Sequence, residues 1–168
     1  MPARRPFGSA VADAAVRHWL DEVVIDEVSL APASPQQEHE RAVAVTDLLK
    51  DNVFEPQGGP GGPYQLRVGL LDERLDFHIG GADFEARHLL SLTPFRRIVR
   101  DYMQICRSYN DAIQGASPSQ IEAIDMGRRG LHNDGAEMLR DRLQGKVKMD
   151  VATSRRLFTL ICALHWRG

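Results

Sequence analysis

The sequence has few cysteines and no long hydrophobic run. Its two cysteines, Cys106 and Cys162, fall within apolar helical patterns, so buried free thiols are expected rather than a disulfide or a metal site. No apolar segment approaches the roughly 20 residues that cross a bilayer. The first residues also lack the continuous apolar segment of a secretory signal. These absences predict a cytoplasmic protein without membrane contact.

Motifs of metal binding, cofactor binding and nucleophilic catalysis are also missing. The 6 histidines are dispersed, and neither Cys-x-x-Cys nor His-Glu-x-x-His occurs. The segment EPQGGPGGP, residues 55–63, precedes a strand pattern and lacks a following Gly-Lys-Ser or Gly-Lys-Thr, so it predicts an irregular connector rather than a phosphate-binding loop. There is no Gly-x-Ser-x-Gly. We therefore predict neither a metal nor a cofactor, and we assign no catalytic residue.

The small net charge of −2 hides an asymmetry between the two halves of the chain. Residues 1–93 contain 8 Lys and Arg against 15 Asp and Glu, whereas residues 94–168 contain 13 against 8. A basic C-terminal half favours an anionic partner. Arginines scattered over solvated helix faces explain the same count, so this alternative stays open.

Length and patterning predict one α+β domain. Residues 1–15 are expected to be a flexible N-terminal tail, and residues 16–168 the single domain. Alternating apolar residues and a β-branched cluster predict a small antiparallel sheet of three to four strands; the segments are 19–30, 64–70, 75–79 and 84–90. About four helices, most of them in the C-terminal half, are expected to cover one face of this sheet.

The strongest helical pattern lies at residues 93–115. Apolar side chains recur there at steps of three and four residues; they are Phe95, Ile98, Val99, Tyr102, Ile105, Cys106, Tyr109 and Ile113. Thr93 is the predicted N-cap, Pro94 suits the first turn and Gly115 can end the helix. This pattern predicts a core helix around which the rest of the chain is organised.

The other helices are predicted mainly from their first residues. Ser-Pro-x-Gln sets at Ser34 and Ser117 have the pattern of a capping box with a first-turn proline, and Asp150 can cap a last, apolar and therefore buried helix. Residues 144–149 are expected to be a connector.

The helix that starts at Ser117 contains Gly127, Gly130 and Gly135, each of which costs about 1 kcal/mol relative to alanine. One closely packed helix and two helices broken near residues 132–135 both remain open.

One cluster on this helix combines an acid, arginines and a histidine. At about 100° per residue, Asp125, Arg128 and His132 fall within roughly 60° of one another beside the apolar stripe. The guanidinium and the imidazole can hold an anionic group while the carboxylate orients them. Arg129 and Asn133 extend this candidate ligand site. The structural alternative is an internal ion pair and a core-edge histidine that fix helix packing.

Arg96 and Arg97, on the helix at residues 93–115, complete the candidate ligand-binding set. Other arginines that can join them in a basic surface are Arg100, Arg155 and Arg156. Nucleic-acid binding usually also needs exposed aromatic side chains, but Tyr102 and Tyr109 belong to the apolar stripe. We therefore predict an unknown protein or an anionic ligand as partner, and not a nucleic acid.

Several segments resemble a known family; they are SLTPFRRIVRDY, SPSQIEAIDMGRRGLHNDGAEML and RRLFTLICALHWRG, with EHERAVA and GGPYQL before them. Over roughly residues 20–168, the chain resembles the uncharacterised alphaproteobacterial protein family zero-two-six-two. The resemblance implies one cytoplasmic bacterial domain. It assigns no activity and no functional residue.

Three hypotheses for function follow. The first is a non-enzymatic binding or regulatory protein that engages an acidic or phosphate-bearing partner through its Arg- and His-bearing helical face. The second is a small enzyme in which His132 is the general base, Asp125 orients it and Arg128 binds an anionic substrate. The third is a structural subunit whose apolar C-terminal helix completes a homodimer.

Overall fold

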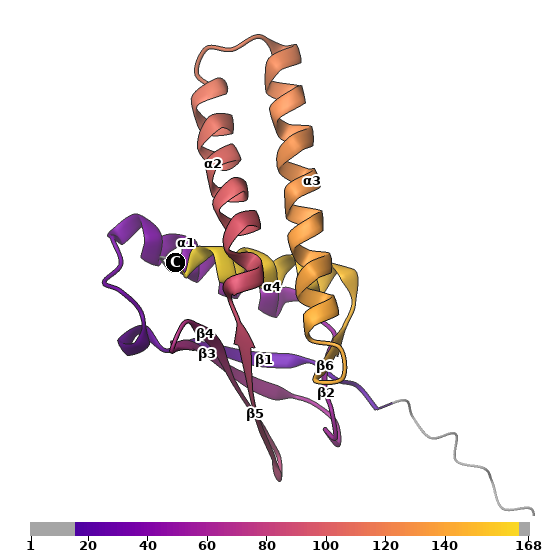
Figure 1. Cartoon of the computed structure of the whole chain (residues 1–168). Coiled ribbons are helices and arrows are strands. Elements are labelled where there is room, and N and C mark those ends of the chain that lie inside the picture. Colours follow the sequence, from indigo (N-terminus) through magenta and orange to yellow (C-terminus); the bar gives the residue numbers. More distant parts are fainter. Residues whose placement is uncertain (1–15, 165–168) are drawn as a thin grey trace, which may run out of the picture.

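A computed structural model describes residues 16–164 of the chain (Figure 1). The tail expected at residues 1–15, and residues 165–168, lie outside the described residues. Within the described part, the chain forms a 4-stranded sheet, a 2-stranded sheet and the helices α1 to α4. The predicted α+β class and the largely helical C-terminal half are confirmed.

The main sheet is mixed, because its first strand runs parallel to its neighbour. In spatial order the strands are β1 (Leu20–Ile25), β3 (Tyr64–Leu71), β4 (Arg74–Gly81) and β5 (Phe84–Ser91). The last three form the expected antiparallel strands, whereas β1 lies parallel to β3, with Val23 beside Leu66. Parallel neighbours require a crossover connection, and here the crossover contains α1. The β-branched cluster predicted a strand but carried no information about its direction.

Tight turns join the antiparallel strands. Asp72 and Glu73 adopt φ values of 48° and 60° between β3 and β4. Positive φ at both central residues gives a turn whose twist matches that of the flanking strands. The inward side chains of this hairpin are almost fully buried; they are Leu66, Val68, Leu75, Phe77 and Ile79.

Helices α1 (Pro35–Lys50) and α4 (Val151–Ala163) pack together over one face of the sheet (Figure 1). The predicted Ser34 capping box and Asp150 cap are both present. Most of α4 is buried, as its apolar sequence predicted. Buried Arg41 of α1 donates hydrogen bonds to the Ala163 and Leu164 carbonyls. These bonds satisfy carbonyl groups that the end of a helix cannot pair by itself.

A small second sheet corrects two expectations for irregular chain. Strand β2 (Phe54–Pro56) pairs antiparallel with β6 (Val147–Met149). The first two residues of the segment at 55–63 and the last three of the connector at 144–149 are therefore extended strand. Neither strand is long enough to show an alternating pattern, and each pairs only with a distant segment.

Helices α2 (Arg96–Ala112) and α3 (Pro118–Arg142) form an antiparallel hairpin that projects away from the sheet (Figure 1). We call this hairpin the arm. The prediction of a core helix is wrong for most of α2, because only Val99 and Ala112 in it are buried. Residues 93–95 form a 3-10 turn before α2, and Thr93 caps no backbone group. An amphipathic stripe requires one neighbouring helix, and α3 supplies it.

Helix α3 is continuous through its glycines, which resolves the alternatives left open above. A Cβ at Gly127 would lie 2.9 Å from Ile105 Cδ1, and a Cβ at Gly135 would overlap the ring of Phe158. These two glycines therefore permit close packing against α2 and α4. A Cβ at Gly130 would meet nothing within 4 Å. The capping box predicted at Ser117 is present.

Candidate anion-binding site

A cavity of about 500 Å³ lies where the arm meets α4. It is lined by Tyr102, Arg128, Arg129, His132, Asn133 and Arg155, and we call it the arginine cavity. Helix α3 supplies most of these side chains, α2 supplies the tyrosine and α4 supplies Arg155. The structure thus brings the arginines, the histidine and the asparagine predicted on α3 together at one cavity.

Asp125 holds two of the arginines in place. Its Oδ1 accepts a hydrogen bond of 2.6 Å from Arg128 Nη2, and its Oδ2 accepts one from Arg129 Nη2. The Arg128 guanidinium also lies 4.0 Å from the centroid of the Tyr109 ring, a cation–π arrangement. Hydrogen bonding from Arg128, and then from Arg129, lowers the pKa of the Asp125 carboxyl group. The carboxylate is therefore ionised at neutral pH and orients both guanidinium groups.

His132 is held between aromatic rings and a threonine. Its ring centroid lies 5.2 Å from that of Tyr102 and 5.5 Å from that of Phe158. Its Nε2 lies 2.7 Å from Thr159 Oγ1. Because Thr159 Oγ1 donates its single hydrogen to the Arg155 carbonyl, at 3.1 Å, this geometry favours a His132 tautomer that carries its proton on Nε2.

Burial lowers the pKa of His132, and the positive charges of Arg155 and Arg128 lower it further. The imidazole is therefore neutral at pH 7. In the described part of the chain, no side chain hydrogen bonds to Nδ1. Asp125, which was expected to orient this histidine, bonds to the arginines instead.

The interactions expected under the structural alternative are present in the cluster. Asp125 and Arg128 form the internal ion pair, and His132 packs at the edge of the core. Such packing and ligand binding do not exclude each other, because the paired arginines still line the cavity. Arg155 makes no ion pair with any residue in the range 16–164 that the structure describes, so its charge is not compensated by an acid.

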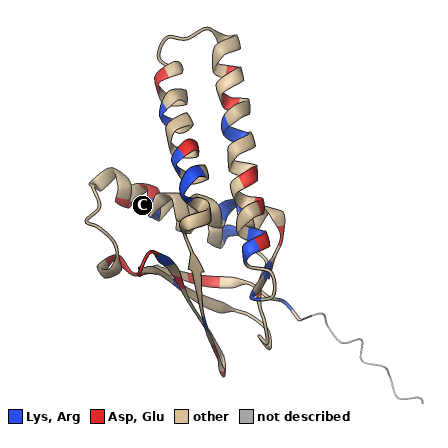
Figure 2. Ribbon diagram, in the orientation of Figure 1, with Lys and Arg blue, Asp and Glu red and all other residues tan. Residues whose placement is uncertain are grey.

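Two residues of the predicted set lie elsewhere. Arg96 Nη2 donates to Glu73 Oε2 at 3.0 Å, and Arg97 Nε lies 3.8 Å from Asp101 Oδ2. Neither arginine lines the arginine cavity. Acidic and basic residues alternate along both helices of the arm (Figure 2), and Arg97 and Arg100 of α2 both lie within ion-pair distance of Asp101.

Two residues that line or contact the arginine cavity were not assigned to it from the sequence. Tyr102 was placed in the apolar stripe, and Thr159 was not singled out. A usable signal was the pair Arg155 and Thr159, because Thr159 is the one polar residue in the apolar second half of α4 and lies one turn after Arg155.

Within residues 16–164, no group of His, Cys, Asp and Glu side chains is arranged to hold a metal ion. No helix in the same range combines the length and the apolar character that a membrane span requires.

A family profile described as "Uncharacterised protein family (UPF0262)" matches residues 17–167. This match includes every strand and helix named above and the whole arginine cavity. The chain belongs to UPF0262. The resemblance inferred from the sequence segments is thereby confirmed.

UPF0262 proteins of several bacteria are similar over nearly their full length. The protein of Caulobacter vibrioides (strain NA1000 / CB15N) is 58% identical over 156 residues, which cover 93% of this chain and 98% of the relative. That of Rhizobium meliloti (strain 1021) is 59% identical over 152 residues, covering 89% and 95%. That of Phenylobacterium zucineum (strain HLK1) is 56% identical over 156 residues, covering 93% and 98%. No solved structure matches the chain.

Proposed function

We propose that this UPF0262 protein is a non-enzymatic binding protein that holds an acidic or phosphate-bearing group of its partner in the arginine cavity. One observation supports the proposal above all others: Arg128, Arg129 and Arg155 reach the same cavity from two different helices. Guanidinium groups present planar pairs of donors that match phosphate and carboxylate oxygens. Asp125 pairs with Arg128 and Arg129, and one carboxylate does not neutralise three arginines, so a positive charge remains for the ligand.

Preorganisation strengthens this argument. Asp125 already fixes Arg128 and Arg129, so a ligand does not have to order these long side chains itself. The proposal includes a cytoplasmic location, with which the free thiols of Cys106 and Cys162 are consistent.

The test uses inorganic phosphate and a glutamate hexapeptide as probes, measured by isothermal titration calorimetry at pH 7 and low salt. Arg155→Gln should weaken binding of the preferred probe about tenfold or more, because charge-assisted hydrogen bonds are lost. The matched control is Arg142→Gln, an exposed arginine in the last turn of α3 that does not line the cavity. The affinity of this control variant for the same probe should equal that of the wild type.

Two results would reject the proposal. One is the absence of binding of both probes to the wild type. The other is an equal loss in Arg155→Gln and Arg142→Gln, because the affinity would then reflect total charge rather than the cavity.

The enzyme alternative rests on a different observation. His132 is neutral, lines the cavity and retains Nδ1 as a proton acceptor, as a general base requires. Its expected orienting group, Asp125, is instead bonded to arginines, so the binding proposal has the stronger support. The variant His132→Gln separates the two hypotheses. A binding protein should keep its phosphate affinity within about threefold of the wild type, whereas an enzyme would lose its catalytic activity because its general base is removed.

A further inference from the structure

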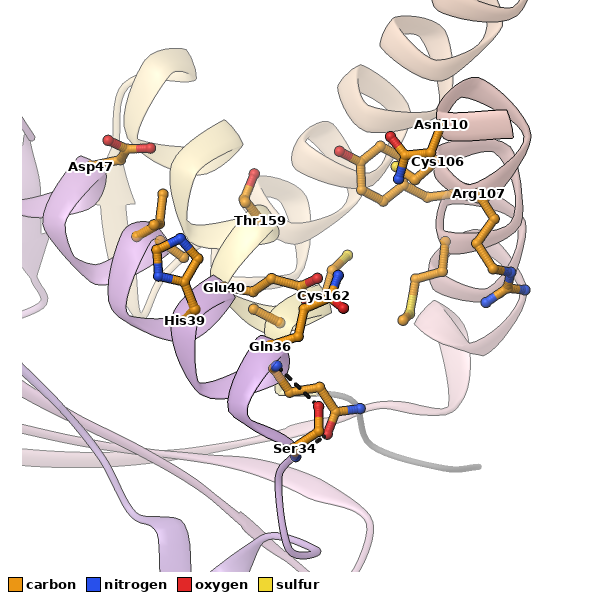
Figure 3. Close-up of a pocket in the computed structure, with 16 residues that line it drawn as sticks. Ser34, Gln36, His39, Glu40, Asp47, Cys106, Arg107, Asn110, Thr159 and Cys162 are labelled. Atoms are coloured by element: carbon orange, nitrogen blue, oxygen red, sulfur yellow. Dashed lines mark hydrogen bonds between the residues drawn. The ribbon is translucent and has the colours of Figure 1, made fainter. Parts of the chain in front are cut away.

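A second cavity, of about 710 Å³, shares a lining residue with the arginine cavity, and Figure 3 shows the residues that line it. It lies between α1, α2 and α4, and we call it the α1–α2 groove. Its volume falls in the usual range for small-molecule sites, about 300–1,000 Å³. Tyr102 lines both the α1–α2 groove and the arginine cavity.

A hydrogen bond also links the two cavities. Thr159 lines the α1–α2 groove, and its Oγ1 lies 2.7 Å from Nε2 of His132, which lines the arginine cavity. Arg155 and Thr159 are one turn apart on the exposed side of α4, a rise of about 6 Å. The two cavities therefore lie within about one helical turn of each other along α4.

Apolar side chains form part of the groove lining. Its wall and floor carry aliphatic, aromatic and sulfur-containing side chains; they are Val43, Ala44, Tyr102, Met103, Cys106, Cys162 and Ala163. Val43 keeps 44% of its surface exposed, so apolar area is still open to a ligand. Burial of this area by an apolar group would be favourable.

The groove carries charged side chains of both signs, among them Arg107 of α2 (Figure 3). The α1 wall carries Glu40 and Asp47 (Figure 3), and Asp47 Oδ1 lies 3.3 Å from Lys50 Nζ. Lys50 compensates the charge of Asp47, whereas three guanidinium groups line the arginine cavity, which therefore attracts a phosphate group more strongly than the groove does. The two cavities thus differ in character: three arginines line the cavity on one side of Tyr102, and the groove on the other side adds apolar side chains.

Building on the proposed function, we infer that the ligand is a soluble organic phosphate with an apolar substituent. Its phosphate group lies among Arg128, Arg129 and Arg155. Its substituent lies over Tyr102 and Met103 in the α1–α2 groove. The arginines recognise the charge, and the groove selects which phosphate esters bind.

Calorimetry with inorganic phosphate and hexyl phosphate tests this inference. Hexyl phosphate should bind about tenfold or more tightly than inorganic phosphate, because the alkyl chain leaves water. Equal affinities would overturn the inference while leaving the proposed function intact. Absence of binding of both phosphates would also overturn the inference, and the proposed function would fall with it only if the glutamate hexapeptide did not bind either. Binding to phosphatidic acid vesicles without any gain for hexyl phosphate would indicate a membrane surface contact and would also overturn the inference.

A pair of valine variants places the substituent. Val43 in the groove and Val53 outside it are both 44% exposed, so neither Val43→Asn nor Val53→Asn disturbs the buried core. Val43→Asn should reduce the advantage of hexyl phosphate about threefold or more and leave the affinity for inorganic phosphate unchanged. Val53→Asn should change neither affinity. Equal effects of the two variants would show that the chain does not lie in the groove.

Discussion

Helix α4 of the body is buried far more deeply than helix α2 of the arm. The body consists of the two sheets with α1 and α4, and the arm is the hairpin of α2 and α3. In α4, 8 of 13 residues are buried, whereas in the longer α2 only 2 of 17 are. Yet α2 has the clearest amphipathic pattern in the sequence. The comparison shows that a clear apolar stripe indicates a neighbour on one side, not a position in the core.

The arginine cavity lies at the junction of these two regions. Phe158 of α4 contacts Tyr102 and His132 of the arm, and Gly135 gives its ring room. The body thus fixes one end of the arm. His132, which lines the arginine cavity, takes part in this contact. Variants at the junction and at the tip of the arm can separate the contributions of the two regions.

The largest expected effect concerns the junction. Phe158→Ala removes a fully buried ring and should lower the free energy of unfolding by about 3–5 kcal/mol. Its counterpart in the arm, Ile113→Ala, affects a side chain that is 53% exposed and should cost less than about 1 kcal/mol. Urea denaturation followed by circular dichroism measures both. Similar losses would contradict the difference in burial between α4 and the arm.

A glycine pair sharpens the comparison within a single helix. Gly135→Ala should destabilise the protein by about 1–3 kcal/mol, because its Cβ would overlap Phe158. Gly130→Ala should instead stabilise it by up to about 1 kcal/mol, because the new methyl group meets nothing within 4 Å and alanine is the better helix former. The midpoints of thermal unfolding should shift in opposite directions. A shift of the same sign in both variants would refute the packing inferred for α3.

The smallest expected effect is a dependence of stability on pH. Burial, Arg155 and Arg128 lower the pKa of His132 in the folded protein, and Tyr102 packs against the same ring. The unfolded chain, with a histidine pKa of about 6.5, therefore binds more protons, so stability should fall as the pH drops below that value. Urea titrations at pH 7.5 and pH 5.5 should show a smaller fall for His132→Gln than for the wild type.

A matched variant in the body isolates the contribution of the arm. Burial and Lys146 also lower the pKa of His88 in β5, so His88 contributes a fall of the same sign. The combined His88→Gln and His132→Gln protein should therefore show the flattest profile. An unchanged profile in His132→Gln would mean that this histidine is as hydrated in the folded state as in the unfolded state.

Local spacing accounts for the features that the sequence predicted well. The capping sets at Ser34 and Ser117, the cap at Asp150 and the strands that alternate around Leu66 and Phe77 all depend on residues a few positions apart. The short strands β2 and β6 were missed because each pairs only with a segment far away in the chain.

For the site, the sequence alone determined that an acid, an arginine and a histidine share one side of a helix, because α-helical geometry follows directly from residue spacing. Only the tertiary structure decided that Arg155 and Thr159 join them, that Arg96 and Arg97 do not, and that β1 runs parallel to its neighbour. The physical reason is that packing between distant segments depends on shape complementarity and on the paths of the connections, and neither is visible in a local pattern.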